Sequence, residues 1–281
     1  MVQSFGGSWT KQKLEILERY LDRYTTALKN QDFRLIYVDA FAGEGVWQTK
    51  SDYDAEDYGE YREMVYDGSA RIALNVEDKP IDKLVFIEQD SSRCASLQKL
   101  RSEYPRRYIA VQNEDANVAL ASFCSGMQNW DRAVVFLDPF ATEVRWETIE
   151  KIAGTKKIDC WILFPLSAVT RMLPTVGTPP IEWQNKLDLI FGGREYWQSM
   201  YRPSLQPDLW GERKIGRDSG SEAIANRYRE RLENVFTKVA PTRKTLRNSK
   251  NVALFELFLG AGNPRGAPIA VDIADHILKN W

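Results

Sequence analysis

The sequence contains little histidine and little cysteine. Its 281 residues include one histidine, His276, and three cysteines, Cys94, Cys124 and Cys160. The cysteines are far apart and odd in number, so neither a disulfide framework nor a metal site with closely spaced ligands is predicted. Free thiols fit a reducing cytoplasm. A single histidine leaves little material for a histidine metal cluster or a Ser-His-Asp triad.

Long apolar runs are missing as well. No run of about 18 apolar residues occurs, so the sequence predicts no membrane span. The first 17 residues lack the basic and apolar regions of a secretory signal, and we expect a cytoplasmic protein. With 43% hydrophobic residues, the chain can bury the core of one large α/β domain, alone or with an insertion.

Net charge is −1, but the charges are unevenly distributed. Residues 51–67 carry seven acids and one arginine, whereas residues 227–250 carry eight basic residues and two acids. Both segments are interpretable as solvated faces. They are equally interpretable as an acidic loop and a basic rim that border a cleft, and the rim would attract phosphate.

Apolar runs alternate with helical patterns along most of the chain. A helix is predicted over 8–30, because leucines recur every three or four residues. Strands and helices then alternate about five times up to residue 166. This alternation is typical of a parallel sheet with helices on both faces. The strands are predicted within 35–43, 83–90, 108–117, 132–141 and 157–166.

The pattern changes after residue 166. Residues 167–220, rich in proline and tryptophan, are predicted to form an insertion or cap. A terminal strand pair within 245–261 and a closing helix over 267–280 complete the core. We therefore expect a core from 1–166 and 221–281, interrupted by the insertion.

Four successive predicted strands each end with an acid: Asp39, Glu88, Asp115 and Asp138. Ligands of open α/β sheets bind outside the carboxyl ends of the strands, so we expect these acids to share one site. The turn after the first strand has Gly43 and Gly45 but no third glycine, unlike a dinucleotide fingerprint. No Gly-Lys-Ser or Gly-Lys-Thr follows, so a phosphate-binding P-loop is absent.

The strand-end stretches resemble motifs of a known class of proteins. "VDAFAGEG" resembles the first motif of class I S-adenosylmethionine-dependent methyltransferases, and "FIEQD" and "NEDA" are similar to their second- and third-strand motifs. "LDPFA" resembles the Asp-Pro-Pro-aromatic motif of amino-group methyltransferases. The wider chain resembles the bacterial three-Cys-motif partner proteins through "YVDAFAGEG", "VFLDPFA", "IDCWILFPLSAVTRML" and "NSKNVALFELFLGAGNP".

The resemblance implies a fold and a cofactor. The fold would be Rossmann-like, a mostly parallel seven-stranded sheet with an antiparallel terminal strand and helices on both faces. The cofactor would be S-adenosylmethionine, with the glycines under its methionine part, Asp39 at its amino group, Glu88 on both ribose hydroxyls and Asp115 on the adenine amino group. The implied cofactor-binding residues are Asp39, Phe41, Gly43, Gly45, Glu88, Gln89, Asp115 and Ala116. Each strand-end acid is alternatively a structural cap.

Asp138, Pro139 and Phe140 are the candidate catalytic residues that the resemblance implies. The Asp138 side chain and the Pro139 carbonyl would accept the two hydrogens of an amino group and hold it in line for transfer. Phe140 would stack on an extruded base. The sequence departs from the motif because Phe140 directly follows Pro139, without a second proline, which puts transfer to a base amine in question. Weaker substrate candidates are Lys156, Arg171 and Asn263.

Several functions stay open at this point. The leading hypothesis is methyl transfer to an amino group of a nucleic acid or nucleobase. Others are transfer to a small molecule or protein, and a cofactor-binding partner subunit of a three-cysteine, radical S-adenosylmethionine-like metal-cluster protein, without transfer of its own. A nuclease would need a metal site, for which Asp39, Asp115 and Asp138 are candidates. All methyltransferase readings require Glu88 and the glycine turn to face one common hollow.

Overall fold

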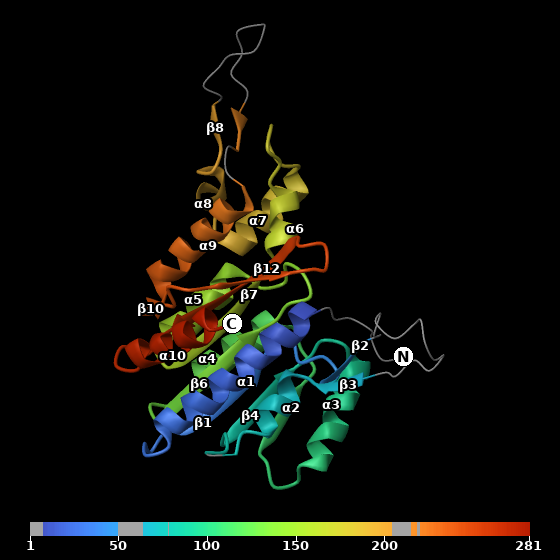
Figure 1. The fold of residues 1–281 in the computed structure, drawn as a ribbon, viewed down its shortest axis with the longest axis vertical. Coiled ribbons are helices and arrows are strands. Elements are labelled where there is room, and N and C mark those ends of the chain that lie inside the picture. Colours follow the sequence, from blue (N-terminus) through green and yellow to red (C-terminus); the bar gives the residue numbers. More distant parts are fainter. Residues whose placement is uncertain (1–7, 50–63, 78, 204–214, 218–219) are drawn as a thin grey trace, which may run out of the picture.

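The computed structural model describes residues 8–49, 64–77, 79–203, 215–217 and 220–281. Within these residues, an eight-stranded sheet runs in the order β10-β12-β7-β6-β1-β4-β5, with β11 also paired to β12 (Figure 1). Its strands are β1 (Arg34–Asp39), β4 (Lys83–Ile87), β5 (Ile109–Gln112), β6 (Asp131–Leu137), β7 (Ile158–Phe164), β10 (Lys238–Val239), β11 (Lys244–Arg247) and β12 (Ala253–Ala261).

The strand directions confirm the predicted Rossmann-like fold. Strands β5, β4, β1, β6 and β7 are parallel, and β12 is antiparallel to β7. The count differs from the predicted seven because the edge strand is divided. Both β10 and β11 pair with β12, on either side of Pro241. Proline has no N–H to donate to the ladder, so an interruption of an edge strand there is expected.

Helices cover both faces of the sheet, as predicted. The central strands are buried on both sides, which explains their continuous apolar sequences. One core joins the sheet to α1, α2, α3 and α10, and the other joins it to α4, α5, α6, α7 and α9. The bounds are α1 (Ser8–Leu28), α2 (Ser69–Leu74), α3 (Ser91–Glu103), α4 (Ala116–Gly126), α5 (Trp146–Gly154), α6 (Leu166–Met172), α7 (Ile181–Phe191), α9 (Ser221–Val235) and α10 (Ala267–Lys279).

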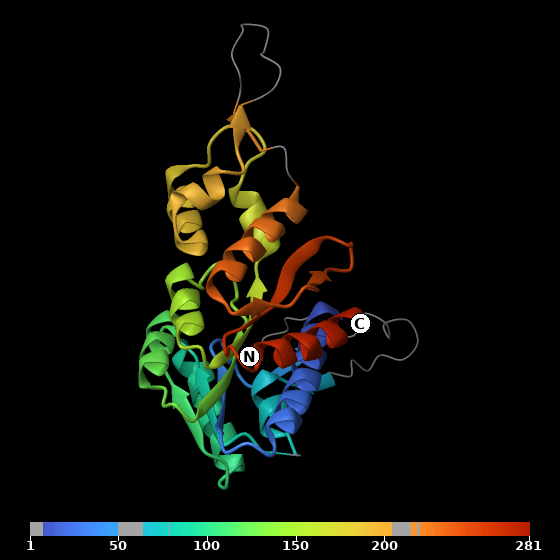
Figure 2. The ribbon, with the colours of Figure 1, turned by 90° about the vertical axis from the view of Figure 1, so that its left-hand side faces the viewer.

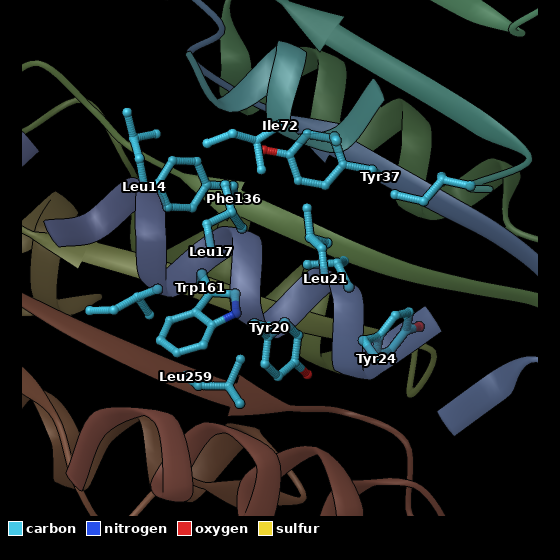
Figure 3. Packing of buried hydrophobic residues seen from close by; sticks show 14 of the residues in the cluster. Leu14, Leu17, Tyr20, Leu21, Tyr24, Tyr37, Ile72, Phe136, Trp161 and Leu259 are labelled. Carbon is cyan, nitrogen blue, oxygen red and sulfur yellow. The ribbon is translucent and has the colours of Figure 1, made fainter. Parts of the chain in front are cut away.

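Helix α1 lies across the first of these cores. Its residues Leu14, Leu17, Tyr20, Leu21 and Tyr24 are buried, as the leucine spacing predicts. Figure 3 shows these side chains meeting Tyr37, Phe136, Trp161 and Leu259, which come from four strands of the sheet. This packing fixes the first turn of α1 at the sheet edge where the polar strand ends lie.

The predicted insertion contains regular structure. Besides α6 and α7 it holds α8 (Arg194–Gln198) and a small antiparallel pair, β8 (Arg202–Pro203) and β9 (Ile215–Gly216). In Figures 1 and 2 these elements extend beyond the sheet, and α7 packs on α5 and α6. Another antiparallel pair, β2 (Val46–Thr49) with β3 (Met64–Asp67), follows the glycine turn. Residues 51–63 of the predicted acidic segment lie outside the described residues.

None of the helices in the described part of the chain has the length and apolar character that a membrane crossing requires.

Candidate functional site

A hollow of about 900 Å³ lies at the carboxyl ends of the parallel strands. Its wall is formed by the segments after β1, β4, β5 and β6, together with the first two turns of α1, part of α6 and the start of β12. It brings together most of the residues predicted from the sequence. These are Phe41, Gly43, Gly45, Glu88, Gln89, Asp115, Ala116, Asp138, Pro139, Phe140 and Arg171.

The glycine turn and Glu88 face this hollow together. Gly43 has φ +60° and Gly45 has φ +77°, a backbone conformation that glycine adopts without steric cost. The Gly43 N–H donates to Glu88 Oε2 at 3.0 Å, and the Asp90 N–H donates to Oε1 at 2.8 Å. Each carboxylate oxygen therefore has one donor from the protein and capacity for another. The expectation of one common hollow is confirmed.

Asp39 lies beneath the turn and does not line the hollow. It is fully buried, and its carboxylate accepts from the Phe41 N–H at 3.3 Å and the Tyr37 hydroxyl at 3.4 Å. Its pKa is raised to about 7, mainly by burial and also by the nearby charge of Asp138, while a hydrogen bond with Ser69 opposes the rise. In this structure Asp39 supports the turn. Its contact with a ligand stays a prediction.

Asp115 and Ala116 mark the start of α4. The Asp115 side chain accepts from the backbone N–H groups of Asn117 at 3.0 Å and Val118 at 3.2 Å, which makes it the N-cap of the helix. Asp115 is therefore a structural cap, the alternative role considered for each strand-end acid. Asp115 also lines the hollow, so its capping role and its predicted ligand contact are compatible.

Asp138, Pro139 and Phe140 directly follow β6 and line the hollow. The Glu143 carboxylate accepts from the Phe140 N–H at 2.8 Å and from the Ala141 N–H at 3.3 Å, which closes this loop on itself. Asp138 pairs with the ammonium group of Lys13. Phe140 is 66% exposed. An aromatic ring on the rim of a hollow can contact a planar ligand.

Sequence reasoning missed the contribution of α1 and β12. Trp9, Thr10 and Lys13 of α1 and Leu254 and Phe255 of β12 line the hollow. One signal was available: Lys13 stands four residues before Leu17, on the face of α1 that carries the buried leucines. A charged residue in a buried stripe needs a partner, and here that partner is 125 positions away.

Two of the weaker substrate candidates are at the wrong end of the sheet. Lys156 precedes β7, and the site lies beyond the other end of that strand. Asn263 follows β12, which is antiparallel to β7, and the neighbouring Gly262 N–H donates to Ile158 O at 2.9 Å. The prediction that Asn263 lies at the same rim is therefore wrong. Its side chain instead accepts from the Arg265 and Gly266 N–H groups, both at 2.9 Å, before α10.

The basic segment 227–250 does not line the hollow. Three of its arginines pair with acids on α9: Arg227 with Glu230, Arg229 with Glu233, and Arg243 with Glu222. The hollow itself is rich in carboxylates. Seven acids line it, against the three cations Lys13, Arg93 and Arg171; the acids are Glu44, Glu88, Asp90, Glu114, Asp115, Asp138 and Glu143.

Within the described residues, no group of three or more acids, cysteines or histidines is arranged to hold a metal ion. Asp39, Asp115 and Asp138 therefore do not form the cluster that the nuclease alternative requires.

No protein-family model matches the sequence, and no curated protein matches it significantly. Solved structures do resemble it. Protein LPL1258 of Legionella pneumophila has a TM-score of 0.52 at 14% identity, over 95% of this chain and 91% of that chain. Trm1 from Pyrococcus horikoshii, solved with S-adenosyl-L-methionine, has a TM-score of 0.48 at 10% identity, over 96% of this chain and 61% of that one.

The N-terminal domain of EvdMO1, solved with SAH bound, has a TM-score of 0.39 at 11% identity, over 88% of this chain and 81% of that domain's chain. The likeness to LPL1258 is a likeness of fold. The weaker similarities add no argument about this chain's function.

Proposed function

We propose that this protein is an S-adenosylmethionine-dependent methyltransferase that acts on an amino group of a nucleobase, free or within a nucleic acid. One observation carries the proposal: the glycine turn, the Glu88 carboxylate and the Asp138-Pro139 pair all line one hollow of about 900 Å³. That volume is in the range of small-molecule sites.

The residues present fit the donor molecule. Glu88 can accept from two neighbouring hydroxyl groups, because each of its oxygens has a free lone pair beside its backbone donor. A Cβ atom at Gly43 would meet nothing within 4 Å, so the turn leaves open space on its ligand side. The carboxylates that line this part of the hollow suit a ligand of net positive charge.

When bound, S-adenosylmethionine supplies an electrophilic methyl group on a positively charged sulfur. The protein's part is to hold the acceptor. Asp138 Oδ1 and the Pro139 carbonyl can accept the hydrogens of an amino group, which directs the nitrogen lone pair toward the donor. Phe140 at the rim offers its ring to a planar acceptor.

A small-molecule acceptor is the second candidate, and the charge of the hollow favours it. Acids outnumber bases there, and three of the five arginines of 227–250 are paired with acids outside the hollow. Phosphates of a polymer would thus gain little attraction close to the reacting atoms. The partner-subunit alternative, with a three-cysteine metal-cluster protein, predicts binding of the donor without transfer.

Calorimetry tests the donor site first. We expect S-adenosylmethionine to bind with a micromolar Kd, and ATP and NAD not to bind. Glu88→Gln removes the charge that holds the ribose, so Kd should rise at least tenfold, on the scale of a lost charge-assisted hydrogen bond. Glu103→Gln, at the exposed end of α3, is the matched control and should leave Kd unchanged.

Transfer is then measured with a methyl-labelled donor against pools of RNA, DNA, nucleosides and small amines. Label in a nucleobase supports the proposal. Tight donor binding with no label in any pool contradicts it and favours the partner-subunit alternative.

A further inference from the structure

Lys13 is a buried cation on the acceptor side of the hollow. It lies in the first turns of α1, is 7% exposed, and forms an ion pair with Asp138 Oδ2. Its Nζ lies 5.0 Å from the centre of the Trp9 ring, and Trp9 in turn lies 5.1 Å from Phe255, between ring centres. A buried charge is costly without a partner, so Lys13 and Asp138 depend on each other.

We propose that Lys13 is the fixed counter-ion of Asp138 and makes the acceptor subsite select an uncharged amino group. This inference rests on the proposed function. With Oδ2 held by Lys13, Oδ1 is the carboxylate oxygen that can accept a hydrogen from the acceptor. An uncharged aromatic amino group supplies that hydrogen without adding charge.

An alkylammonium acceptor would meet different conditions. It would bring a second positive charge to a carboxylate that Lys13 already neutralises, and like charges at such short distances repel strongly in a partly desolvated site. The donor's sulfonium would add a third positive charge nearby. Lys13 is thus a positioning residue for Asp138 and a discriminator between acceptors.

The charges of Lys13 and Asp138 should also affect how tightly the hollow binds the methyl donor, and this effect can be measured. S-adenosylmethionine carries one more positive charge than S-adenosylhomocysteine, and the two are otherwise closely similar. The ratio of their affinities therefore reports the charge of the hollow. If Lys13 only anchored α1, its loss would change stability and weaken both ligands alike, leaving the ratio unchanged.

The experiment measures both affinities by calorimetry for the full chain and for single and double variants. Lys13→Met leaves Asp138 unpaired and should raise the preference for S-adenosylmethionine about tenfold, as one charge within several ångströms can. Asp138→Asn leaves Lys13 unpaired and should lower that preference by a similar factor. The double variant Lys13→Met with Asp138→Asn should return it to the wild-type ratio.

Two controls separate charge from packing. Lys13→Arg keeps the cation and should retain the wild-type ratio. Lys11→Met removes a lysine that lies on the same helix, exposed and paired with Glu15 at 3.7 Å, and should also retain it.

Acceptor selection is tested with two probes on protein saturated with S-adenosylhomocysteine. Aniline carries an uncharged amino group at neutral pH, whereas benzylamine is an ammonium ion of similar size. By NMR titration, Lys13→Met should bind benzylamine at least fivefold more tightly than the wild type does, with less than a twofold change for aniline.

The failures are distinguishable. If the wild type binds neither S-adenosylmethionine nor S-adenosylhomocysteine, the proposed function is wrong. If it binds both, and Lys13→Met leaves their ratio or the benzylamine affinity unchanged, the role assigned to Lys13 is wrong. A double variant that fails to restore the ratio would also overturn the pairing.

Discussion

At the scale of single residues, the two glycines of the turn should respond differently to substitution. A Cβ at Gly45 would lie 3.1 Å from Leu100 Cδ2 and 3.6 Å from Leu97 Cδ2, inside the core, whereas a Cβ at Gly43 would meet nothing within 4 Å. Both positions carry the cost of a left-handed backbone, about 1–2 kcal/mol. We expect Gly45→Ala to lower the free energy of unfolding further, by about 2–4 kcal/mol in total, because overpacking is added.

Gly43→Ala should act mainly on binding. Its methyl group would occupy space on the ligand side of the turn, so the Kd of S-adenosylmethionine should rise at least tenfold while stability falls by only about 1–2 kcal/mol. Urea denaturation and calorimetry on both variants check this, with Gly126→Ala, a position with open surroundings, as the control. Equal stability losses at Gly43 and Gly45 would contradict the geometry.

Individual residues show what the sequence could predict about the site. Glu88 and Asp138 were predictable because parallel strands direct their carboxyl ends to one edge, so a motif's place in the strand gives its place in space. The place of Asn263 was not predictable, because the direction of β12 depends on its pairing with β7, which no local pattern reveals. The ion-pair partner of Lys13 was not predictable either, since it depends on how α1 docks on the sheet.

At the scale of elements, the Asn117 side chain connects α4 to the loop that follows Asp138 and to the start of α5. This side chain is 8% exposed. Its Oδ1 accepts from the Arg145 N–H at 3.0 Å and from the Thr148 hydroxyl at 2.8 Å, and its Nδ2 donates to the Glu143 carbonyl at 3.0 Å. Asn117 therefore holds the loop after Asp138 against the helix that Asp115 caps.

Asn117→Ala removes all three hydrogen bonds and should lower the free energy of unfolding by about 2–4 kcal/mol, at about 1 kcal/mol for each bond plus the cost of groups left unpaired. Ser122→Ala, on the exposed face of the same helix, should change it by less than about 0.5 kcal/mol. Chemical denaturation measures both. A loss at Asn117 no larger than at Ser122 would show that the loop is held by other contacts.

The elements themselves were largely predictable. Continuous apolar runs such as "LIYV" and "CWILF" are typical of strands buried on both faces, and β1 and β7 are such strands. The divided edge strand was not, since β10 has only two residues and depends on β12 for its hydrogen bonds. The helices α7 and α8 follow proline- and glycine-rich stretches that hide their periodicity in the sequence.

At the scale of the whole molecule, buried acids should make stability depend on pH. Asp159 on β7 is 7% exposed and accepts from the Tyr20 hydroxyl at 3.1 Å. Its pKa is raised from 3.8 to about 7, because the effect of burial exceeds that of this hydrogen bond and of the other groups that lower the pKa. Asp39 has a pKa of about 7 for the same main reason. Between pH 4 and 7 the folded protein thus binds protons that the unfolded chain has released.

This difference in bound protons decides whether stability rises or falls with pH. Stability from these two acids is fully present below the unfolded pKa of 3.8 and is lost as pH rises through about 7. Each acid contributes a slope of at most about 1.4 kcal/mol per pH unit.

Asp159→Asn keeps an acceptor for Tyr20 but cannot titrate. Its free energy of unfolding, measured in urea at pH 5, 6, 7 and 8, should therefore fall less steeply than the wild type's. Asp131 should show the opposite dependence on pH. Burial is the largest influence on its pKa and raises it, but hydrogen bonds from Arg34 and the Gln128 N–H, with the positive charges of Arg34 and Lys157, together lower the pKa below its usual value. Asp131→Asn should therefore cost stability near neutral pH and progressively less toward acid. Parallel curves for Asp159→Asn and the wild type would show that Asp159 is already ionised in the folded protein, and that the loss of stability with pH has another source.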